Sequence, residues 1–404
     1  MIQTFIYKLL QRRHFWRYAT FGEVAEIYAS RTMRLFALRI VTTFTSIYLY
    51  QEGYSLIFLA YFWAAFYGIK VLFAWPSAQL IARFGPKHAT LVSNIVSAVG
   101  MTFLPLVPIY GLKALVPWLI LQAFSSCLND LAYLVDFSKV KNIEHAGKEI
   151  GYMNIFEKVA TGVSPLVGGM LAFFFGPEVV MILSAALFLL AAVPLFHTGE
   201  PTHTHQKLAI RGFPWRTTWR SLIAEASIGY DVFVTGSAWT LFMVVAIFVN
   251  NGDEIYAKVG VLTSITIVAA LLSSYTFGRI IDHSRGGDLL TVSVILNGIT
   301  HLFRPFVIGP IGVAAVNSVN EAATTGYAMA FIRGMFDTAD ASGRRIVYLF
   351  FMEVATNFGA MFGGVLLALI FMVVNGVLAL QIFFIISGFI VLLIGTPRFM
   401  LYRK

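Results

Sequence analysis

The chain has 404 residues, of which 58% are hydrophobic and 12% are charged, and its formal net charge is +9. Soluble domains carry about 25% charged residues, so a water-soluble fold of this size would leave too much apolar surface uncovered, and the sequence predicts a membrane protein. The Lys and Arg residues are scattered along the whole chain and are not gathered with aromatic residues, which argues against nucleic-acid binding.

Residues 1–30 form a basic segment ahead of the first apolar run. Ile2, Phe5, Ile6 and Leu9 recur at helical spacing beside several Lys and Arg residues, a pattern typical of a helix that lies in the membrane interface. A disordered tail is the alternative. The segment lacks the apolar stretch that a secretory signal needs, so we expect no cleaved signal here.

Twelve apolar runs of spanning length follow, separated by Gly, Pro or charged residues, at about 20 residues per spanning helix. In the first half they lie at about 31–51, 56–82, 89–109, 114–137, 150–175 and 178–196. In the second half they lie at about 228–250, 257–281, 289–308, 310–332, 346–372 and 376–398. The sequence therefore predicts an all-α membrane protein with two pseudo-symmetric six-helix bundles, 31–196 and 228–404, joined by a cytoplasmic loop at 197–227.

The distribution of positive charge predicts the orientation, because cytoplasmic loops carry an excess of Lys and Arg. If both termini are cytoplasmic, most of the 29 Lys and Arg residues fall in cytoplasmic segments, and only Lys113 and Lys258 fall in outer loops. Four cations lie within the spans: Arg39, Lys70, Lys158 and Arg304. We therefore predict that both termini are cytoplasmic.

The two halves share local sequence features, as expected for a transporter built from internal repeats. The stretch 159–169 aligns without gaps with 354–364, and Asn129-Asp130 matches Asn320-Glu321. In both long stretches a small residue recurs at every fourth position, which lets helix backbones approach closely in lipid. We interpret these stretches as helix-packing seams.

The loop 278–286 is similar to the Gly-x-x-x-Asp-(Arg)-x-x-Gly signature of the major facilitator superfamily of secondary transporters. The predicted architecture resembles that family as well, and span five is similar to its antiporter signature. The matching loop of the first half lacks the glycine and the aspartate of the signature. In the resembled family this loop latches the outward-open state, which implies a conformational role for the residues that remain: Arg83, Gly85, Gly278, Asp282 and Arg285.

Spans one, four, seven and ten line the central cavity in the resembled family. Polar residues on these spans recur at helical spacing, so each set shares one face of its helix. The substrate-cavity candidates, with one cation of span two, are Arg39, Thr43, Ser46, Tyr50, Lys70, Gln122, Asn129, Tyr133, Trp239, Asn317, Asn320 and Thr324.

Ionisable groups at membrane depth are costly and are therefore functional candidates. Burial raises the pKa of a carboxyl and a nearby cation lowers it, so a proton can favour one conformation over another. We predict Asp130, Glu321 and Glu353 as proton carriers, with Arg39 or Lys70 as a cationic partner or as the anchor of a substrate anion.

Static ion pairs are the alternative to proton carriers: Arg39 with Asp130, or Lys70 with Glu353. Lys158 and Glu353 occupy matching positions in the two repeats, which suggests a salt bridge between the halves. Arg304 lies beside a proline near the outer end of its span, and we expect it to be an interface anchor.

The sequence thus predicts a proton-coupled secondary transporter of a small solute, and the antiporter-like span five favours export. It contains no phosphate-binding GxxxxGK[ST] loop and no HExxH or GxSxG motif, which argues against an ATP-driven pump or an enzyme. A lipid flippase or lipid exporter on the same scaffold is the main alternative, and a non-transporting sensor is a third. We expect a monomer in the lipid bilayer of a prokaryotic cytoplasmic membrane, without cofactor, metal or nucleic acid.

Overall fold

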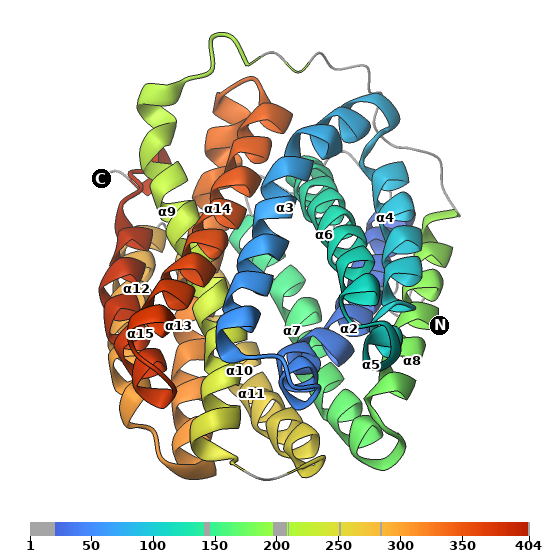
Figure 1. Ribbon diagram of the computed structural model, residues 1–404. Coiled ribbons are helices and arrows are strands. Elements are labelled where there is room, and N and C mark those ends of the chain that lie inside the picture. The colour runs from blue at the N-terminus through green and yellow to red at the C-terminus, as the bar shows by residue number, and fades with distance from the viewer. Residues whose placement is uncertain are drawn as a thin grey trace.

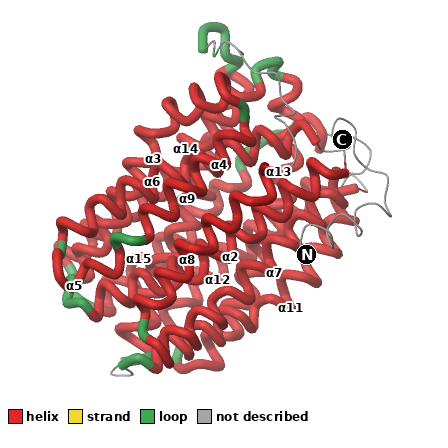
Figure 2. The backbone as a smooth tube through the Cα atoms, turned by 90° about the vertical axis from the view of Figure 1, so that its right-hand side faces the viewer, coloured by secondary structure: helices red, strands yellow, loops and turns green. Residues whose placement is uncertain are grey.

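The computed structural model describes residues 21–140, 146–196, 208, 210–249, 252–282 and 285–402. Within these ranges the chain is helical and contains no strand. Long helices run side by side through one bundle, and short loops join them at its two ends (Figures 1 and 2). We call the end where α3 ends and α4 begins the upper end, as oriented in Figure 1, and the opposite end the lower end.

The helices follow the order of the predicted spans. The first half contains α2 (Phe21–Gln51), α3 (Leu56–Phe84), α4 (Pro86–Met101), α5 (Val107–Tyr110), α6 (Leu112–Val140), α7 (Ala146–Phe175) and α8 (Pro177–Ala192). The second half contains α9 (Trp215–Phe233), α10 (Trp239–Phe242), α11 (Glu254–Asp282), α12 (Gly286–Phe303), α13 (Gly309–Ala341), α14 (Arg345–Val373) and α15 (Val377–Ile390). Two π-helical stretches, Val234–Ala238 and Met243–Ile247, flank α10 and extend the helical segment that starts with α9.

Ten segments of the described chain are long and apolar enough to cross a membrane. The helices α2 and α13 are 31 and 33 residues long but are too polar to be among them. At about 1.5 Å per residue, both exceed the roughly 30 Å thickness of the hydrocarbon core. Their polarity comes partly from charged and amide side chains that were predicted to line the cavity, such as Arg39 and Asn320.

Two helices extend beyond their predicted limits. The helix α2 begins at Phe21 and thus takes up the end of the segment 1–30, whose residues 1–20 lie outside the described chain. The helix α9 begins at Trp215, within the expected loop 197–227. Both extensions carry charged residues, such as Glu26 and Glu225, which lowered the local hydropathy but find polar partners inside the bundle.

The aligned stretches of the two halves pack in matching ways, which confirms the predicted seams. A Cβ atom on Gly168 of α7 would lie 2.5 Å from a backbone oxygen of α2, and one on Gly363 of α14 would lie 2.9 Å from a ring carbon of α9. The following glycines face the other half of the molecule: a Cβ on Gly169 would lie 2.3 Å from a carbonyl oxygen of α11, and one on Gly364 would lie 2.9 Å from a side chain of α3. The repeat is therefore structural.

The halves also meet at the lower end. The Gln51 Nε2 donates to the Gly252 carbonyl oxygen at 3.1 Å, and the Tyr256 hydroxyl donates to the Gln51 Oε1 at 2.5 Å. The rings of Phe44 and Tyr256 meet edge to face nearby, with centroids 5.6 Å apart. In this structure α2 and α11 thus join the halves at the lower end.

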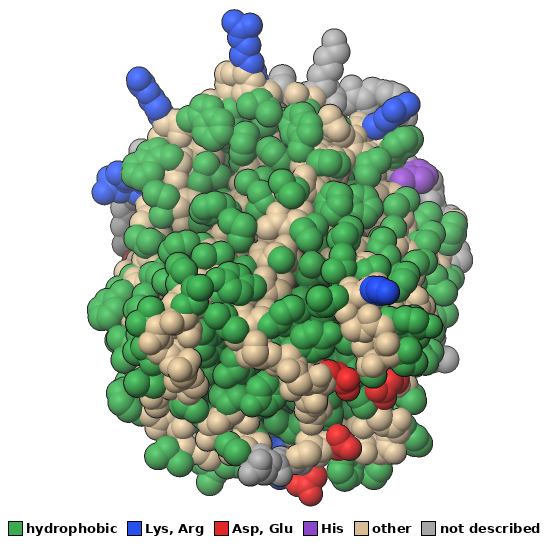
Figure 3. Space-filling model, in the orientation of Figure 1, with side chains coloured by type: hydrophobic (Ala, Val, Ile, Leu, Met, Phe, Trp, Pro, Cys, Tyr) green, Lys and Arg blue, Asp and Glu red, His purple; other side chains and the backbone are tan. Residues whose placement is uncertain are grey.

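Charge separates between the two ends of the molecule. On the face shown in Figure 3, most Lys and Arg side chains stand near the upper end, and the Asp and Glu side chains lie near the lower end, with hydrophobic side chains between them. The residues 210–214, which lead into α9, also lie at the upper end (Figure 1).

Candidate functional site

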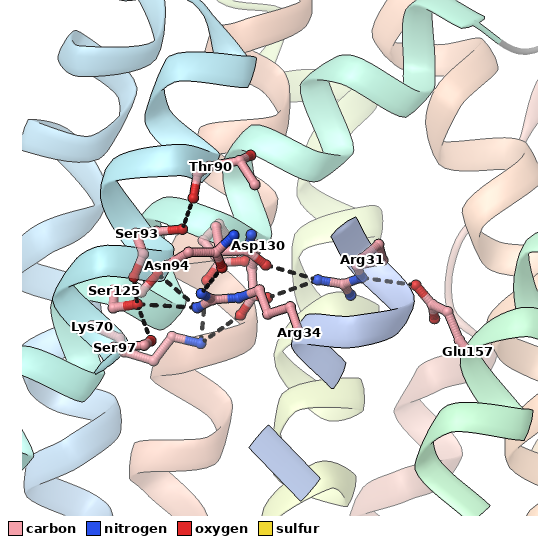
Figure 4. A network of polar contacts seen from close by, with 12 residues as sticks. Arg31, Arg34, Lys70, Thr90, Ser93, Asn94, Ser97, Ser125, Asp130 and Glu157 are labelled. Carbon is pink, nitrogen blue, oxygen red and sulfur yellow. Dashed lines mark hydrogen bonds and ion pairs between the residues drawn. The ribbon is translucent and has the colours of Figure 1, made fainter. Parts of the chain in front are cut away.

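Asp130 of α6 is the centre of a charged network in the first half (Figure 4). Its Oδ2 accepts a hydrogen bond from the Lys70 Nζ of α3 at 3.1 Å, and its Oδ1 lies 3.6 Å from the Arg31 Nη1 of α2. Arg31 also donates to Asn129 at 2.9 Å and to Glu157 at 3.0 Å. Although Asp130 is at membrane depth, its side chain is 38% exposed, so this network borders a solvent-accessible space.

Lys70 connects this network to the second half. Its Nζ lies 3.5 Å from the Glu353 Oε1 of α14, while the same carboxylate accepts a 2.6 Å hydrogen bond from the Asn357 amide. Lys70 is at the middle of α3, and α3 packs against α14 along its length. One ammonium group therefore lies between a carboxylate of its own half and a carboxylate of the other half. The Lys70–Glu353 pair was one of the two ion pairs weighed above.

A second ion pair crosses between the halves. The Lys158 Nζ of α7 lies 2.5 Å from the Glu321 Oε1 of α13. The expected bridge from Lys158 to Glu353 is therefore wrong: these residues do match in the repeats, but each faces a different helix of the opposite half. In both observed pairs the first half supplies the cation and the second half supplies the carboxylate.

Arg39 makes no such pair. Its guanidinium has no hydrogen bond or ion pair with any residue that the structure describes, and its side chain is exposed. The alternative of an Arg39–Asp130 pair is not observed, because Arg31 and Lys70 occupy that carboxylate. Arg39 does lie close enough to the Tyr67 hydroxyl of α3 for an electrostatic interaction.

The other cavity candidates fall into two groups. Those in tertiary contacts include Ser46, which accepts from the Trp63 indole at 2.9 Å, and Gln122, which donates to the Ser97 carbonyl oxygen at 2.8 Å. The Arg31 guanidinium stacks on the Tyr133 ring, and Trp239 donates to Asn317 at 2.8 Å. Candidates that bond only to their own helix or stay exposed are Thr43, Thr324 and Tyr50. The roles of all of them remain predictions.

A buried polar cluster in the second half was not foreseen. Asp231 of α9 bonds with one oxygen to the His301 Nε2 of α12 at 2.6 Å and accepts with the other from the Tyr327 hydroxyl of α13. Arg304 lies next to them, stacked over Trp239, with its Nη2 3.2 Å from the Asn320 Oδ1. Asp231, His301 and Arg304 are 0–1% exposed.

The sequence analysis misplaced this cluster for two reasons. Arg304 is not an interface anchor, since it is enclosed by the bundle. Asp231 received no attention because the seventh span was expected to start only at residue 228, which put this carboxylate at a helix end. The helix begins at Trp215, so Asp231 lies deep inside it. A carboxylate in span seven and an arginine in span nine were the signal that was available.

The residues of the conformational loop motif lie at the upper end. Gly85 joins α3 to α4 with a φ of 91°, a conformation that favours glycine, and Arg83 stacks on the adjacent Phe84 ring. Gly278 and Asp282 belong to the last turns of α11, and Arg285 pairs with Asp288 at 3.5 Å. Their conformational role remains a prediction.

No group of three or more His, Cys, Asp or Glu side chains that would suit a metal ion occurs in the described part of the chain. The histidines of the central loop, His197, His203 and His205, lie outside that part.

Comparisons with known proteins bear on the family and on the fold of the chain. No curated protein matches the chain by sequence. The crystal structure of the nucleoside transporter NupG is similar over 92% of this chain and 96% of that chain, with a TM-score of 0.67 and 11% sequence identity, and a mutant of NupG gives the same score over 97% of its chain. At this identity the likeness concerns the fold. The family model described as Major Facilitator Superfamily matches residues 27–257, more than half of the chain. The chain therefore belongs to the major facilitator superfamily and is an integral, multi-pass membrane transporter.

Proposed function

We propose that the protein is a secondary active transporter that moves a small solute by alternating access and couples this movement to protons. In this proposal α2 and α13 cross the membrane along with the ten apolar segments, and the upper end faces the cytoplasm. The gathering of Lys and Arg at the upper end supports that orientation. The similarity of α7 to the antiporter signature favours solute–proton exchange, and hence export.

The position of Lys70 carries the proposal. Alternating access requires the halves to rock against each other, so ion pairs that cross between them must break. Breaking a buried pair by removing one partner costs about 3–5 kcal/mol, because a charge is left without a partner. Protonation of Glu353 avoids this cost, because Lys70 remains paired with Asp130 of its own half, whose Oδ2 lies 3.1 Å from the Lys70 Nζ. A proton can thus release one half from the other without leaving an uncompensated charge.

Lys158 and Glu321 form the second linkage of this kind. Their side chains are 25% and 23% exposed, so both groups reach solvent while they connect the halves. The hydrogen bonds of Gln51 join the two halves at the lower end. We infer that water and solute reach these charges from the upper end, which corresponds to an inward-facing state.

Proteoliposomes test this proposal. A thermal-shift screen of the purified protein across sugars, nucleosides, amino acids, organic anions and lipophilic cations selects solutes, whose flux is then measured under an imposed pH gradient. We expect Glu353→Gln and Glu321→Gln to lose proton-driven accumulation at least tenfold while solute exchange at equal pH persists. Glu157→Gln is the matched control, because Glu157 pairs with Arg31 of its own half.

Each part of the proposal has its own contradicting result. If none of the protective solutes crosses the membrane, the chain is not a transporter of small solutes. If both glutamine variants accumulate solute like the unaltered protein, coupling does not pass through these carboxylates. If fluorescent phospholipids move between the leaflets while no solute does, the lipid exporter is the better description.

A further inference from the structure

The structure places one unpaired cation at the centre of the bundle. Arg39 is twelve residues above the lower end of α2, which corresponds to about 18 Å at 1.5 Å per residue and lies near the middle of the roughly 30 Å hydrocarbon core. A charged side chain at this depth is costly unless water or a partner compensates it. Its position alone marks Arg39 as a functional candidate.

The contacts of α2 show which way Arg39 points. Ser30 donates to the Ala191 carbonyl oxygen of α8 at 2.7 Å, and Ser184 of α8 donates to the Ala37 carbonyl oxygen at 2.5 Å. The face of α2 that carries Ser30 and Ala37 therefore packs against α8, which lies at the edge of the bundle (Figures 1 and 2). Two residues turn a helix by about 200°, so Arg39 lies on the opposite face and points into the bundle.

The other cations of the first half at this depth already have partners. Arg31, Lys70 and Lys158 each form an ion pair. Arg34 is buried and donates to Asn94 at 2.7 Å and to the Ser125 hydroxyl at 3.0 Å. Arg39 alone among these five leaves its guanidinium without an acceptor in the described chain, and it is also exposed.

The surroundings of Arg39 favour an anion. Tyr67 and Lys70 lie one turn apart on the neighbouring helix α3, and Arg39 interacts electrostatically with the Tyr67 hydroxyl. The nearby carboxylate, Asp130, is shared between Lys70 and Arg31. A guanidinium presents its N–H groups as a planar fork, which matches the two oxygens of a carboxylate or phosphate.

We propose that the transported solute is a small organic anion whose carboxylate or phosphate binds the Arg39 guanidinium. This inference rests on the proposed transport function and names the class of its substrate. Because Lys70 and Lys158 are held by carboxylates, Arg39 is the cation that can accept the solute without first losing another partner.

Matched pairs of acids and amides test the inference on the purified full-length protein. Benzoate and benzamide, and succinate and succinamide, differ in charge but little in shape, and inorganic phosphate tests the phosphate class. We expect the anions to raise the melting temperature and to be transported, and the amides to do neither. Arg39→Gln is expected to weaken anion affinity at least tenfold, whereas Arg39→Lys keeps part of it.

Lys113→Gln is the matched control, since it removes the same charge from an exposed site at the lower end. Equal effects of acids and amides, no protection by any anion, or unchanged anion affinity in Arg39→Gln overturns the anion site. If Arg39→Gln transports neutral solutes as well as the unaltered protein does, the proposed transport function is supported and the proposed substrate class is wrong. If anions raise the melting temperature through Arg39 but no solute crosses the membrane, the anion site is supported and the proposed transport function is contradicted.

Discussion

Each half of the molecule buries one arginine in a polar cluster, and the two clusters are built differently. In the first half, Arg34 of α2 is held by Asn94 of α4 and Ser125 of α6, and its guanidinium lies 5.2 Å from the centre of a phenylalanine ring of α8. In the second half, Arg304 follows α12, bonds to Asn320 of α13 and lies 5.7 Å from the centre of a phenylalanine ring of α15.

The difference lies in the counter-charge. Neutral oxygens hold Arg34, whereas the cluster of Arg304 contains Asp231, which itself bonds to His301 and Tyr327. The first cluster also adjoins Arg31 and Asp130, and through Lys70 it is connected to the other half (Figure 4). The cluster of Arg304 forms all its hydrogen bonds and ion pairs described here within its own half. The two buried arginines do not occupy matching positions of the repeats, because Arg34 lies in span one and Arg304 at the end of span nine, and their electrostatic environments differ as well.

The largest effect is expected from the carboxylate that only the second cluster has. Asp231→Leu leaves His301, Tyr327 and Arg304 without their acidic neighbour in a fully buried site, and we expect a loss of about 3–5 kcal/mol of stability. Thermal and denaturant unfolding in detergent measure it, with Asp231→Asn as the milder control that keeps the shape. A loss below that of the Arg34 variant described next would contradict the distinction between the clusters.

A smaller effect is expected in the first cluster. Arg34→Leu leaves neutral acceptors on Asn94 and Ser125 unpaired, and a buried polar group that loses its hydrogen bond costs about 1–3 kcal/mol. The same unfolding measurements apply, and Arg216→Leu at an exposed position of α9 serves as a surface control. If Arg34→Leu is as damaging as Asp231→Leu, the arginine clusters are electrostatically alike after all.

The smallest difference between two variants is expected at matching glycines of the two repeats. Gly169→Ala and Gly364→Ala add a methyl group at matching positions of α7 and α14, each against the opposite half, and overpacking of this kind costs about 1–3 kcal/mol. Both variants should lower the melting temperature and lower transport to a similar extent. Gly236→Ala is the control, because nothing lies within 4 Å of the added atom. A large difference between the two glycine variants would break the structural equivalence of the seams.

Local sequence patterns predicted much of this architecture. The apolar runs correspond to the helices of the bundle, because each span must hide its backbone from lipid whatever its neighbours are. The glycine seams at 168–169 and 363–364 were also predictable, since only small residues allow close approach of helix backbones. The ionisable residues within the apolar runs stood out by contrast, and Lys70, Asp130, Glu321 and Glu353 do lie in the charged networks.

The partners of these charges were decided by the tertiary structure. Matching positions in the repeats suggested a Lys158–Glu353 bridge, but Lys158 faces α13 and Glu353 faces α3. Arg31 and Arg34 were counted with the cytoplasmic cations, because they lie at the very start of the first span predicted from hydropathy. The sequence by itself determined which apolar runs form the long helices and which charges are exceptional. Which charges pair depends on how distant helices cross and face one another, and for that reason only the assembled bundle distinguishes the paired cations from the unpaired Arg39.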